Sequence, residues 1–312
     1  SLEEIGATLR SVRPLILAAV LVLLFVQYVV SSAKWRTILL SHDIRLPLPT
    51  LVQPYLVGNF FSSFLPSSYM GDLVRVADVG RASGRTYESA SSVALERLSG
   101  LAALSLVGSV ASAYIAAEFA EPMFRLLALL FAGIVLLLAG GFLPGVIEVF
   151  ERVARRLPVA AARRAAGKVA GAVRGYRRQP GLLLRVMGWS FLFQILAYNI
   201  FFLYGRTIGL DLPYLYCFAF VPVIYLLEAL PLSVAGIGLR ESGLVFFLTR
   251  VGFTSSEAIA LGILLVCCRY LASLSGGLLY VLRGGGLPTA ERATATAASA
   301  PAEADAEERR AP

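Results

Sequence analysis

The chain consists mostly of long apolar stretches separated by short polar connections. Stretches close to the roughly 20 residues that a helix needs to cross a bilayer occupy 14–32, 91–117, 123–147, 181–205 and 256–282. Shorter or interrupted apolar stretches occupy 51–65, 214–231 and 241–252. This pattern predicts an all-α integral membrane protein, in which some apolar segments are too short for a comfortable crossing.

Composition supports that class and sets the domain boundaries. Hydrophobic residues make up 57% of the chain and charged residues 15%, whereas soluble domains carry about 25% charged residues. The last part, 284–312, is rich in Ala, Glu, Thr and Pro and has no apolar periodicity. We therefore expect one polytopic domain over 1–283, followed by a disordered tail that cannot bury a core.

One motif occurs twice and divides the chain into halves. The pattern Leu-Pro-x-Ser-x-x-Gly-x-x-x-Arg occupies 65–75 and again 230–240, each time after an apolar run. Broken apolar segments at matching places in two halves indicate a transport site at a repeat interface. Two unrelated turns are the simpler explanation, because proline and glycine commonly interrupt membrane helices. The identical spacing and matched surroundings favour two repeats, about 14–117 and 181–283.

A basic segment fixes the expected orientation in the cell membrane. Residues 148–180 carry nine Lys and Arg residues against two acids, which is typical of a cytoplasmic loop. Alanine and valine between the bases suit an amphipathic helix on anionic lipid headgroups. No aromatic or motif context accompanies the charge, so a nucleic-acid partner is not expected.

With that segment inside, the two short apolar regions must enter and return on the same side. Bases in 33–50 and 76–90 place both ends of the first hairpin inside, with a break at Pro66–Gly71. The second hairpin, within 214–252, starts and ends outside, with a break at Pro231–Gly238. This predicts inverted repeats, each with a re-entrant helical hairpin, an outer amino terminus and a cytoplasmic carboxy terminus.

Charged residues within the apolar segments and at the breaks are the candidate site. They are costly inside a bilayer and therefore face a partner or a cavity; they are Asp72, Arg75, Glu96, Arg97, Glu228, Arg240, Glu241 and Arg269. Mutual pairing between the halves is one explanation. The other is anion capture in one shared cavity, since arginine presents a planar fork that suits phosphate oxygens.

Neutral groups near the breaks would complete such a site. Broken helices leave backbone N–H groups unpaired, with partial positive charge at helix amino termini. Close backbone approach is expected at Gly71, Gly236 and Gly238, and neutral hydrogen bonds from Asn59, Ser63, Ser68 and Ser233. Cys217, Cys267, Cys268 and the one histidine, His42, have no metal-ligand spacing, so neither a metal nor a cofactor is expected.

These residues resemble a known family, the flippase-like proteins built on the transmembrane domain of lysylphosphatidylglycerol synthases. The resemblance covers about 14–283 and is carried by two blocks. The first is Gly58 to Pro66, Gly71-Asp72-x-x-Arg75 and Leu95-Glu96-Arg97, and the second is Leu230-Pro231-x-Ser233-x-x-Gly236-x-Gly238-x-Arg240-Glu241-x-Gly243. The resemblance implies a lipid transporter that moves an anionic phospholipid, or another phosphate-linked lipid, between leaflets.

Two departures from the family bear on function. A synthase domain follows in the relatives, and none follows Arg283 here, so we expect a stand-alone member without aminoacyl transfer. Family members usually have a hydrophobic helix before the one that matches 14–32, and this sequence shows none, so either the chain is truncated or this member lacks it. The identity of the lipid stays open. Two alternatives remain: a membrane-embedded transferase using a phosphate-linked lipid donor, and a non-catalytic scaffold for a cytoplasmic lipid-modifying enzyme. Whether the protein forms a homo-oligomer also stays open.

Overall fold

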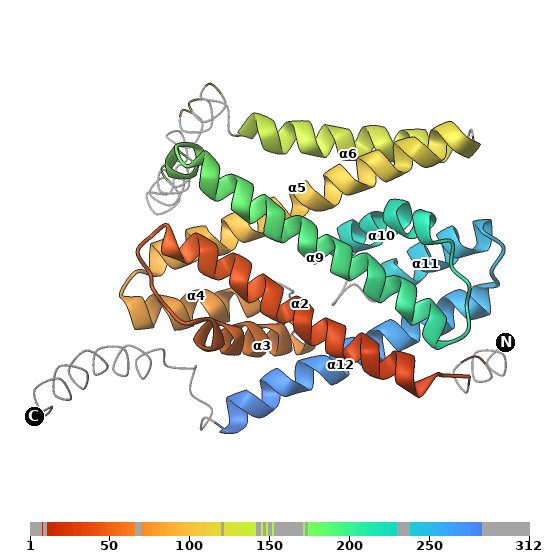
Figure 1. Cartoon of the computed structure of the whole chain (residues 1–312), viewed down its shortest axis with the longest axis horizontal. Helices are drawn as coiled ribbons and strands as arrows, with labels where there is room; N and C mark the ends of the chain where they lie inside the picture. Colours follow the sequence, from red (N-terminus) through yellow and green to blue (C-terminus); the bar gives the residue numbers. More distant parts are fainter. Residues whose placement is uncertain are drawn as a thin grey trace, which may run out of the picture.

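The structure is a computed structural model, and it describes residues 8, 11–65, 70–119, 122–141, 145, 148, 152, 171, 174–229 and 238–282. All regular structure in this part of the chain is α-helical (Figure 1). The helices are α2 (Pro14–Leu40), α3 (Leu48–Phe64), α4 (Met70–Ser83), α5 (Thr86–Phe119), α6 (Pro122–Gly141), α9 (Pro180–Thr207), α10 (Tyr214–Ala229), α11 (Leu239–Arg250) and α12 (Ser255–Leu282). Five of them, α2, α5, α6, α9 and α12, are long and apolar enough to cross a membrane. The prediction of an all-α, multi-pass membrane protein is confirmed.

The first long helix is longer than its apolar stretch. The sequence predicted a helix over 14–32 and an inner loop after it, but α2 continues to Leu40 and includes Lys34. Trp35 and Ile38, in the added turns, are fully buried. Packing of these side chains extends the helix, because tertiary contacts supply most of a helix's stability in a protein.

The two short-helix hairpins lie at opposite ends of the molecule (Figure 1). Helices α2 and α9 pack against each other at the centre. The α3/α4 hairpin lies at the end where α2 finishes and α5 begins. The α10/α11 hairpin lies at the other end, where α9 finishes and α12 begins. Helix α6 packs along α5.

The sequence predicted that the two hairpins enter the membrane from opposite sides, each with a break at its motif. The expected breaks, Pro66–Gly71 and Pro231–Gly238, fall mostly on 66–69 and 230–237, which lie outside the described residues. Re-entry into the membrane and the inverted relation between the halves stay predictions.

The two halves nevertheless agree in element order, length and packing. Helices α2, α3, α4 and α5 have 27, 17, 14 and 34 residues, and their counterparts α9, α10, α11 and α12 have 28, 16, 12 and 28. Helix α3 packs against α12, and α10 packs against α5. Each hairpin therefore contacts the long last helix of the other half, as a two-fold relation between the halves would require.

Helices α3 and α12 approach so closely that α12 needs glycine at the contact. A Cβ atom on Gly276 would lie 2.0 Å from the carbonyl oxygen of Leu56. One on Gly277 would lie 2.6 Å from the ring of Phe60. The backbone of α12 therefore rests directly on α3, without a layer of side chains between them at this point.

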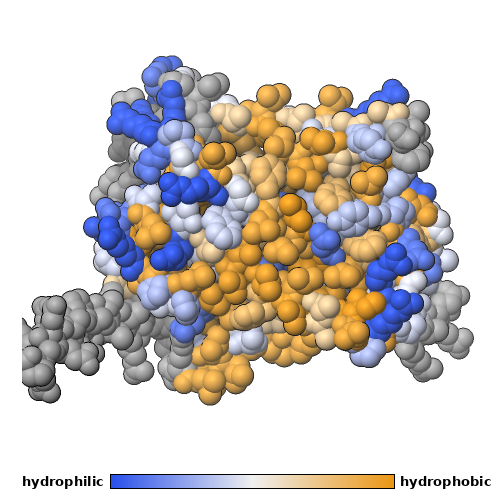
Figure 2. Space-filling view, in the orientation of Figure 1, coloured by the Kyte–Doolittle hydropathy of each residue, from blue (hydrophilic) through white to orange (hydrophobic). Residues whose placement is uncertain are grey.

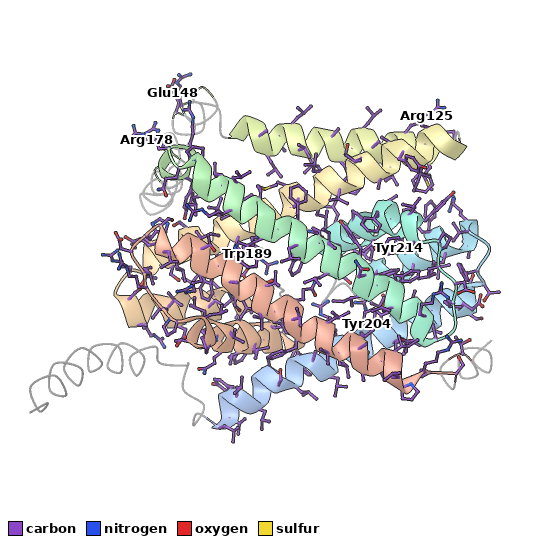
Figure 3. The ribbon with its side chains drawn as sticks, viewed as in Figure 1. Arg125, Glu148, Arg178, Trp189, Tyr204 and Tyr214 are labelled. Atoms are coloured by element: carbon purple, nitrogen blue, oxygen red, sulfur yellow. The ribbon has the colours of Figure 1, made fainter. Side chains whose placement is uncertain are left out.

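Polar residues gather at the two ends of the molecule. Figure 2 shows a broad hydrophobic region across the middle and hydrophilic residues towards the left and right. Glu148 and Arg178 lie at the left end, and Arg125 lies at the right end (Figure 3). Only residues 148, 152, 171 and 174–180 of the predicted amphipathic segment are described, and the predicted tail, 284–312, lies outside the described residues.

Hydrogen bonds join three chain segments near the end of α2 and the start of α5. The Nε2 atom of His42, in the α2–α3 loop, lies 2.7 Å from the hydroxyl of Tyr176, in the segment before α9. Ser91 of α5 lies 3.1 Å from the same hydroxyl, and Arg85 donates to the carbonyl oxygen of His42. Burial lowers the pKa of His42 and raises the pKa of Tyr176 to about 12. The loops that were predicted to share the inner side therefore lie together.

The glycine contact gives a direct test of the α3–α12 packing. We expect Gly276→Ala to lower the unfolding free energy by about 1–3 kcal/mol, because the added methyl group collides with backbone that cannot move aside. Gly188→Ala is the matched control, since a Cβ on Gly188 of α9 meets nothing within 4 Å. Thermal unfolding in detergent measures both variants. Equal melting temperatures would contradict the contact.

Candidate functional site

The charged residues picked out by the sequence form two separate ion-pair networks. The first network comprises Asp72 and Arg75 of α4 with Glu96 and Arg97 of α5. The second network comprises Glu228 of α10, Arg240 and Glu241 of α11, and Arg269 of α12. Each hairpin therefore has its own network, with charges supplied by the adjoining long helix.

Arg75 lies at the centre of the first network. Its Nη2 atom donates to Glu96, and its Nη1 atom lies 3.4 Å from Asp72. The side chain is 5% exposed. Because a buried arginine needs both charge balance and hydrogen-bond acceptors, the two carboxylates account for its place in the protein interior.

Aromatic rings hold the Arg75 guanidinium in position. Its carbon atom lies 4.3 Å from the ring centroid of Trp35 on α2 and 4.2 Å from that of Tyr55 on α3. The Tyr55 hydroxyl also donates to Glu96 at 3.2 Å. Cation–π contacts of this kind gain strength away from water, so α2, α3, α4 and α5 all fix one side chain.

Arg97 connects the first network to the surface. Its Nε atom donates to Asp72 at 2.8 Å, and its side chain is 53% exposed. Asp72 thus lies between a buried arginine, Arg75, and a half-exposed one. Arg97 is therefore the most exposed charged group of this network.

The second network repeats this arrangement with different acids. Arg240 is 5% exposed, and its Nη1 and Nη2 atoms lie 3.0 Å from Glu228 and 2.7 Å from Glu241. The other oxygen of Glu241 accepts the backbone N–H of Gly238 at 2.6 Å. Gly238 has a φ of +91°, a conformation that favours glycine, and precedes the first turn of α11.

Arg269 is the partly exposed arginine of the second network. Its Nη1 atom lies 3.7 Å from Glu228, and its side chain is 31% exposed. In both halves, therefore, an arginine on the hairpin is buried and an arginine on the long last helix is partly exposed. A shared carboxylate links the two in each case: Asp72 in the first network and Glu228 in the second.

Contacts between α2, α3 and α12 connect the surroundings of the two networks. Asn59 of α3 donates to the hydroxyl of Tyr28 on α2 at 2.9 Å, and Arg269 is an electrostatic neighbour of that hydroxyl. The ring of Phe64, at the end of α3, lies 5.0 Å from that of Tyr270. The end of the first hairpin therefore lies against the helix that carries Arg269. That all these charges line one cavity stays a prediction.

The structure describes some of the serine and glycine residues that were predicted to contribute to the site, and not others. Ser63 is buried and its hydroxyl has no hydrogen-bond partner in the described structure. The N–H of Gly71 donates to Ser62 at 3.1 Å, and a Cβ on Gly71 would lie 2.1 Å from the carbonyl oxygen of Gly58. The remaining candidates, Ser68, Ser233 and Gly236, lie outside the described residues.

Sequence reasoning missed the residues that surround the networks. Lys34 was assigned to an inner loop on its charge, but its Nζ atom is buried and donates to the carbonyl of Glu96 at 2.7 Å. Trp35 and Tyr55 carried no signal, because aromatic residues are common in any membrane helix. Tyr28, Ser31 and Lys34 follow one another at a spacing of three residues along α2. This polar stripe is the sequence signal that could have identified Tyr28 and Lys34.

The Arg75–Glu96 pair can be tested by stability. Arg75→Met leaves Glu96 buried without its charged partner, so we expect a loss of about 3–5 kcal/mol in unfolding free energy. Adding Glu96→Gln should restore much of that loss, because the stranded charge is removed. Arg206→Met, which breaks the exposed Arg206–Asp211 pair, should cost no more than about 1 kcal/mol. Additive losses in the double variant would rule out a coupled pair.

Comparison with known proteins gives one match. The family described as the lysylphosphatidylglycerol synthase TM region matches residues 1–276 of this chain. No curated protein and no solved structure matches. The matched residues include both hairpins and all eight charged residues of the two networks.

Proposed function

Because the chain belongs to the family of lysylphosphatidylglycerol synthase transmembrane regions, we propose that it is a lipid transporter. Its substrate is an anionic phospholipid, or another lipid with a phosphate in its headgroup, which it moves between the leaflets of the cell membrane. We place the amino terminus of the chain outside the cell and its carboxy terminus in the cytoplasm.

The observation that supports this proposal is the paired design of the two networks. Each half carries a buried arginine whose donors engage carboxylates, and a partly exposed arginine on the same carboxylate. Charges inside a membrane protein are costly and mark substrate or ion pathways. Two such networks, one at each hairpin, suit a substrate that is passed from one side of the membrane to the other.

The exposure of the arginines assigns them different roles. Arg75 and Arg240 hold carboxylates in place, since their Nη donors are directed to acids within the protein. Arg97 and Arg269 are the partly exposed arginines of the two networks, and a guanidinium is the side chain best suited to a phosphate group. The headgroup would contact Arg97 and Arg269 in turn, while the acyl chains stay in the lipid.

The carboxylates are arranged less well for the transferase alternative. A general base has to be within reach of a substrate proton and ready to accept it. Glu96 is held by Arg75 and Tyr55, and Glu241 by Arg240 and the N–H of Gly238. Donors within the protein thus already occupy oxygens of both carboxylates, which leaves them less available to a substrate proton.

Lysine variants of the exposed arginines test the proposal. We expect Arg97→Lys and Arg269→Lys each to slow exchange of a fluorescent phosphatidylglycerol between the leaflets of proteoliposomes by roughly tenfold. A point charge cannot reproduce the bidentate fork, but it still balances Asp72 or Glu228. Melting temperatures in detergent should therefore stay close to that of the unaltered chain.

The control is Arg206→Lys, since Arg206 is exposed and pairs with Asp211 just after α9. It should exchange lipid at the unaltered rate. Normal exchange by both network variants would remove Arg97 and Arg269 from the transport route. Absence of exchange by the unaltered chain would favour the scaffold alternative.

A further inference from the structure

Helix α5 contains a serine–glycine pair at a place where packing does not require glycine. Ser99 and Gly100 lie near the middle of its 34 residues. Outside its own helix, a Cβ atom on Gly100 would meet only the Nζ atom of Lys34, at 3.6 Å, which is ordinary van der Waals contact. Glycine weakens the interior of a helix, and Gly100 has no close backbone contact of the kind that Gly276 has. Its presence therefore needs another explanation.

Side chains from two other helices donate to backbone carbonyls of α5 at this pair. The Nζ atom of Lys34 on α2 donates to the carbonyl of Glu96 at 2.7 Å, and the Ser99 hydroxyl donates to the same oxygen at 3.0 Å. The side-chain amide of Gln194 on α9 donates to the carbonyl of Gly100 at 3.2 Å. In a regular helix each carbonyl accepts the N–H of the residue four positions later. These two carbonyls would keep a hydrogen bond if α5 bent and those N–H groups moved away.

This combination of features is typical of a place where a helix bends. Sharp bends occur mostly at proline, at glycine–serine pairs and where a side chain enters the backbone ladder. Within a membrane, neighbouring side chains have to satisfy the backbone groups that a bend sets free, because no water is there to do so. Helix α5 has both the pair and the donors in the same turn.

The part of α5 before the pair is fastened to helices of the first half. Ser92 accepts the indole N–H of Trp35 on α2 at 2.8 Å. Glu96 pairs with Arg75 on α4. Both contacts are buried, so this part of α5 keeps its place beside the first hairpin.

The part of α5 after the pair packs against α6 and α10. The Cβ position of Gly108 lies 2.9 Å from the ring of Phe131 on α6 and 3.1 Å from Pro222 on α10. Ile115 and Phe124 belong to one buried cluster further along. Figure 1 shows α5 passing from the side of α4 to the side of α6. A bend at the pair would therefore change the position of α6 and α10 relative to the first network.

We propose that α5 is a hinged helix that bends at Ser99 and Gly100. Gly100 is the hinge, and Lys34 and Gln194 are positioning residues that hold the carbonyls which the bend exposes. This role explains why a buried lysine is directed at a neutral carbonyl. The inference goes beyond the proposed function, because the bend concerns the helix and not the identity of the cargo.

The distance between two spin labels on α5 tests the hinge. Ala90→Cys and Ala113→Cys place the labels at exposed positions on either side of the pair, in the full chain with its three native cysteines replaced by alanine. In a straight helix the two residues lie about 35 Å apart. We expect a broad distance distribution in proteoliposomes, which Gly100→Ala should narrow to about half its width because alanine stabilises the straight helix.

The alanine variant is informative because it fits the structure. The added methyl group meets only the movable end of Lys34, so the melting temperature in detergent should not fall. Gly188→Ala is the matched control, since a Cβ on Gly188 of α9 also finds room, and it should keep the broad distribution. Gln194→Leu removes a donor that the bent form needs, and it should shift the distribution towards the straight-helix distance. A role in packing alone would change only the melting temperature.

Two results would overturn the hinge, even if vesicles show lipid exchange. One is a narrow distribution at the straight-helix distance in the unaltered chain. The other is equal narrowing by Gly100→Ala and Gly188→Ala, because the effect would then not be local to the pair.

Lipid exchange by the same variants separates the hinge from the proposed function. Conformational steps often limit turnover, so Gly100→Ala should slow exchange roughly tenfold. An unaltered rate with a narrowed distribution would overturn a role of the bend in transport. If the unaltered chain exchanges no lipid, the transport proposal fails, while a broad distribution that Gly100→Ala narrows still establishes the hinge.

Discussion

An arginine that leaves water needs a carboxylate beside it, and in both halves of this chain a neighbouring helix supplies one. In the first half, Arg75 on α4 is held by Glu96 on α5, so the pair fastens the hairpin to the long helix. In the second half, Arg240 on α11 is held by Glu228 on α10, so the pair closes the hairpin itself. Because breaking a buried pair strands a charge, the position of each hairpin depends on these contacts.

Much of the fold follows from the apolar pattern. Five stretches of near-bilayer length became five long helices, with starts within a few residues of those predicted, because length and hydropathy alone decide such segments. The end of α2 could not be predicted in this way. Its last two turns contain Lys34 and Arg36 and look like a loop in sequence, yet Trp35 and Ile38 bury themselves against other helices. Contacts of that kind exist only once the chain has folded.

The membership of the site was easier to predict than its geometry. Charged residues in apolar segments are few, so the sequence identified all eight members of the networks. Which arginine is buried and which reaches the surface depends on helix packing: Arg75 and Arg97 carry the same signal in sequence but are 5% and 53% exposed. Of the two alternatives that the sequence left open, the structure shows mutual pairing, but within each half rather than between the halves, and anion capture stays a proposal.

The direct backbone contact between α3 and α12 restricts how the molecule can open. With the carbonyl of Leu56 and the ring of Phe60 occupying the space at Gly276 and Gly277, neither helix can slide or roll against the other without collision. The two helices would therefore move together as one rigid body. At the opposite end, Pro222 of α10 lies 3.1 Å and the ring of Phe131 of α6 lies 2.9 Å from the Cβ position of Gly108 on α5, so α5, α6 and α10 form a second closely packed unit. Opening would then separate two units, each of which combines a hairpin from one half with a long helix from the other half. The two halves themselves would not separate.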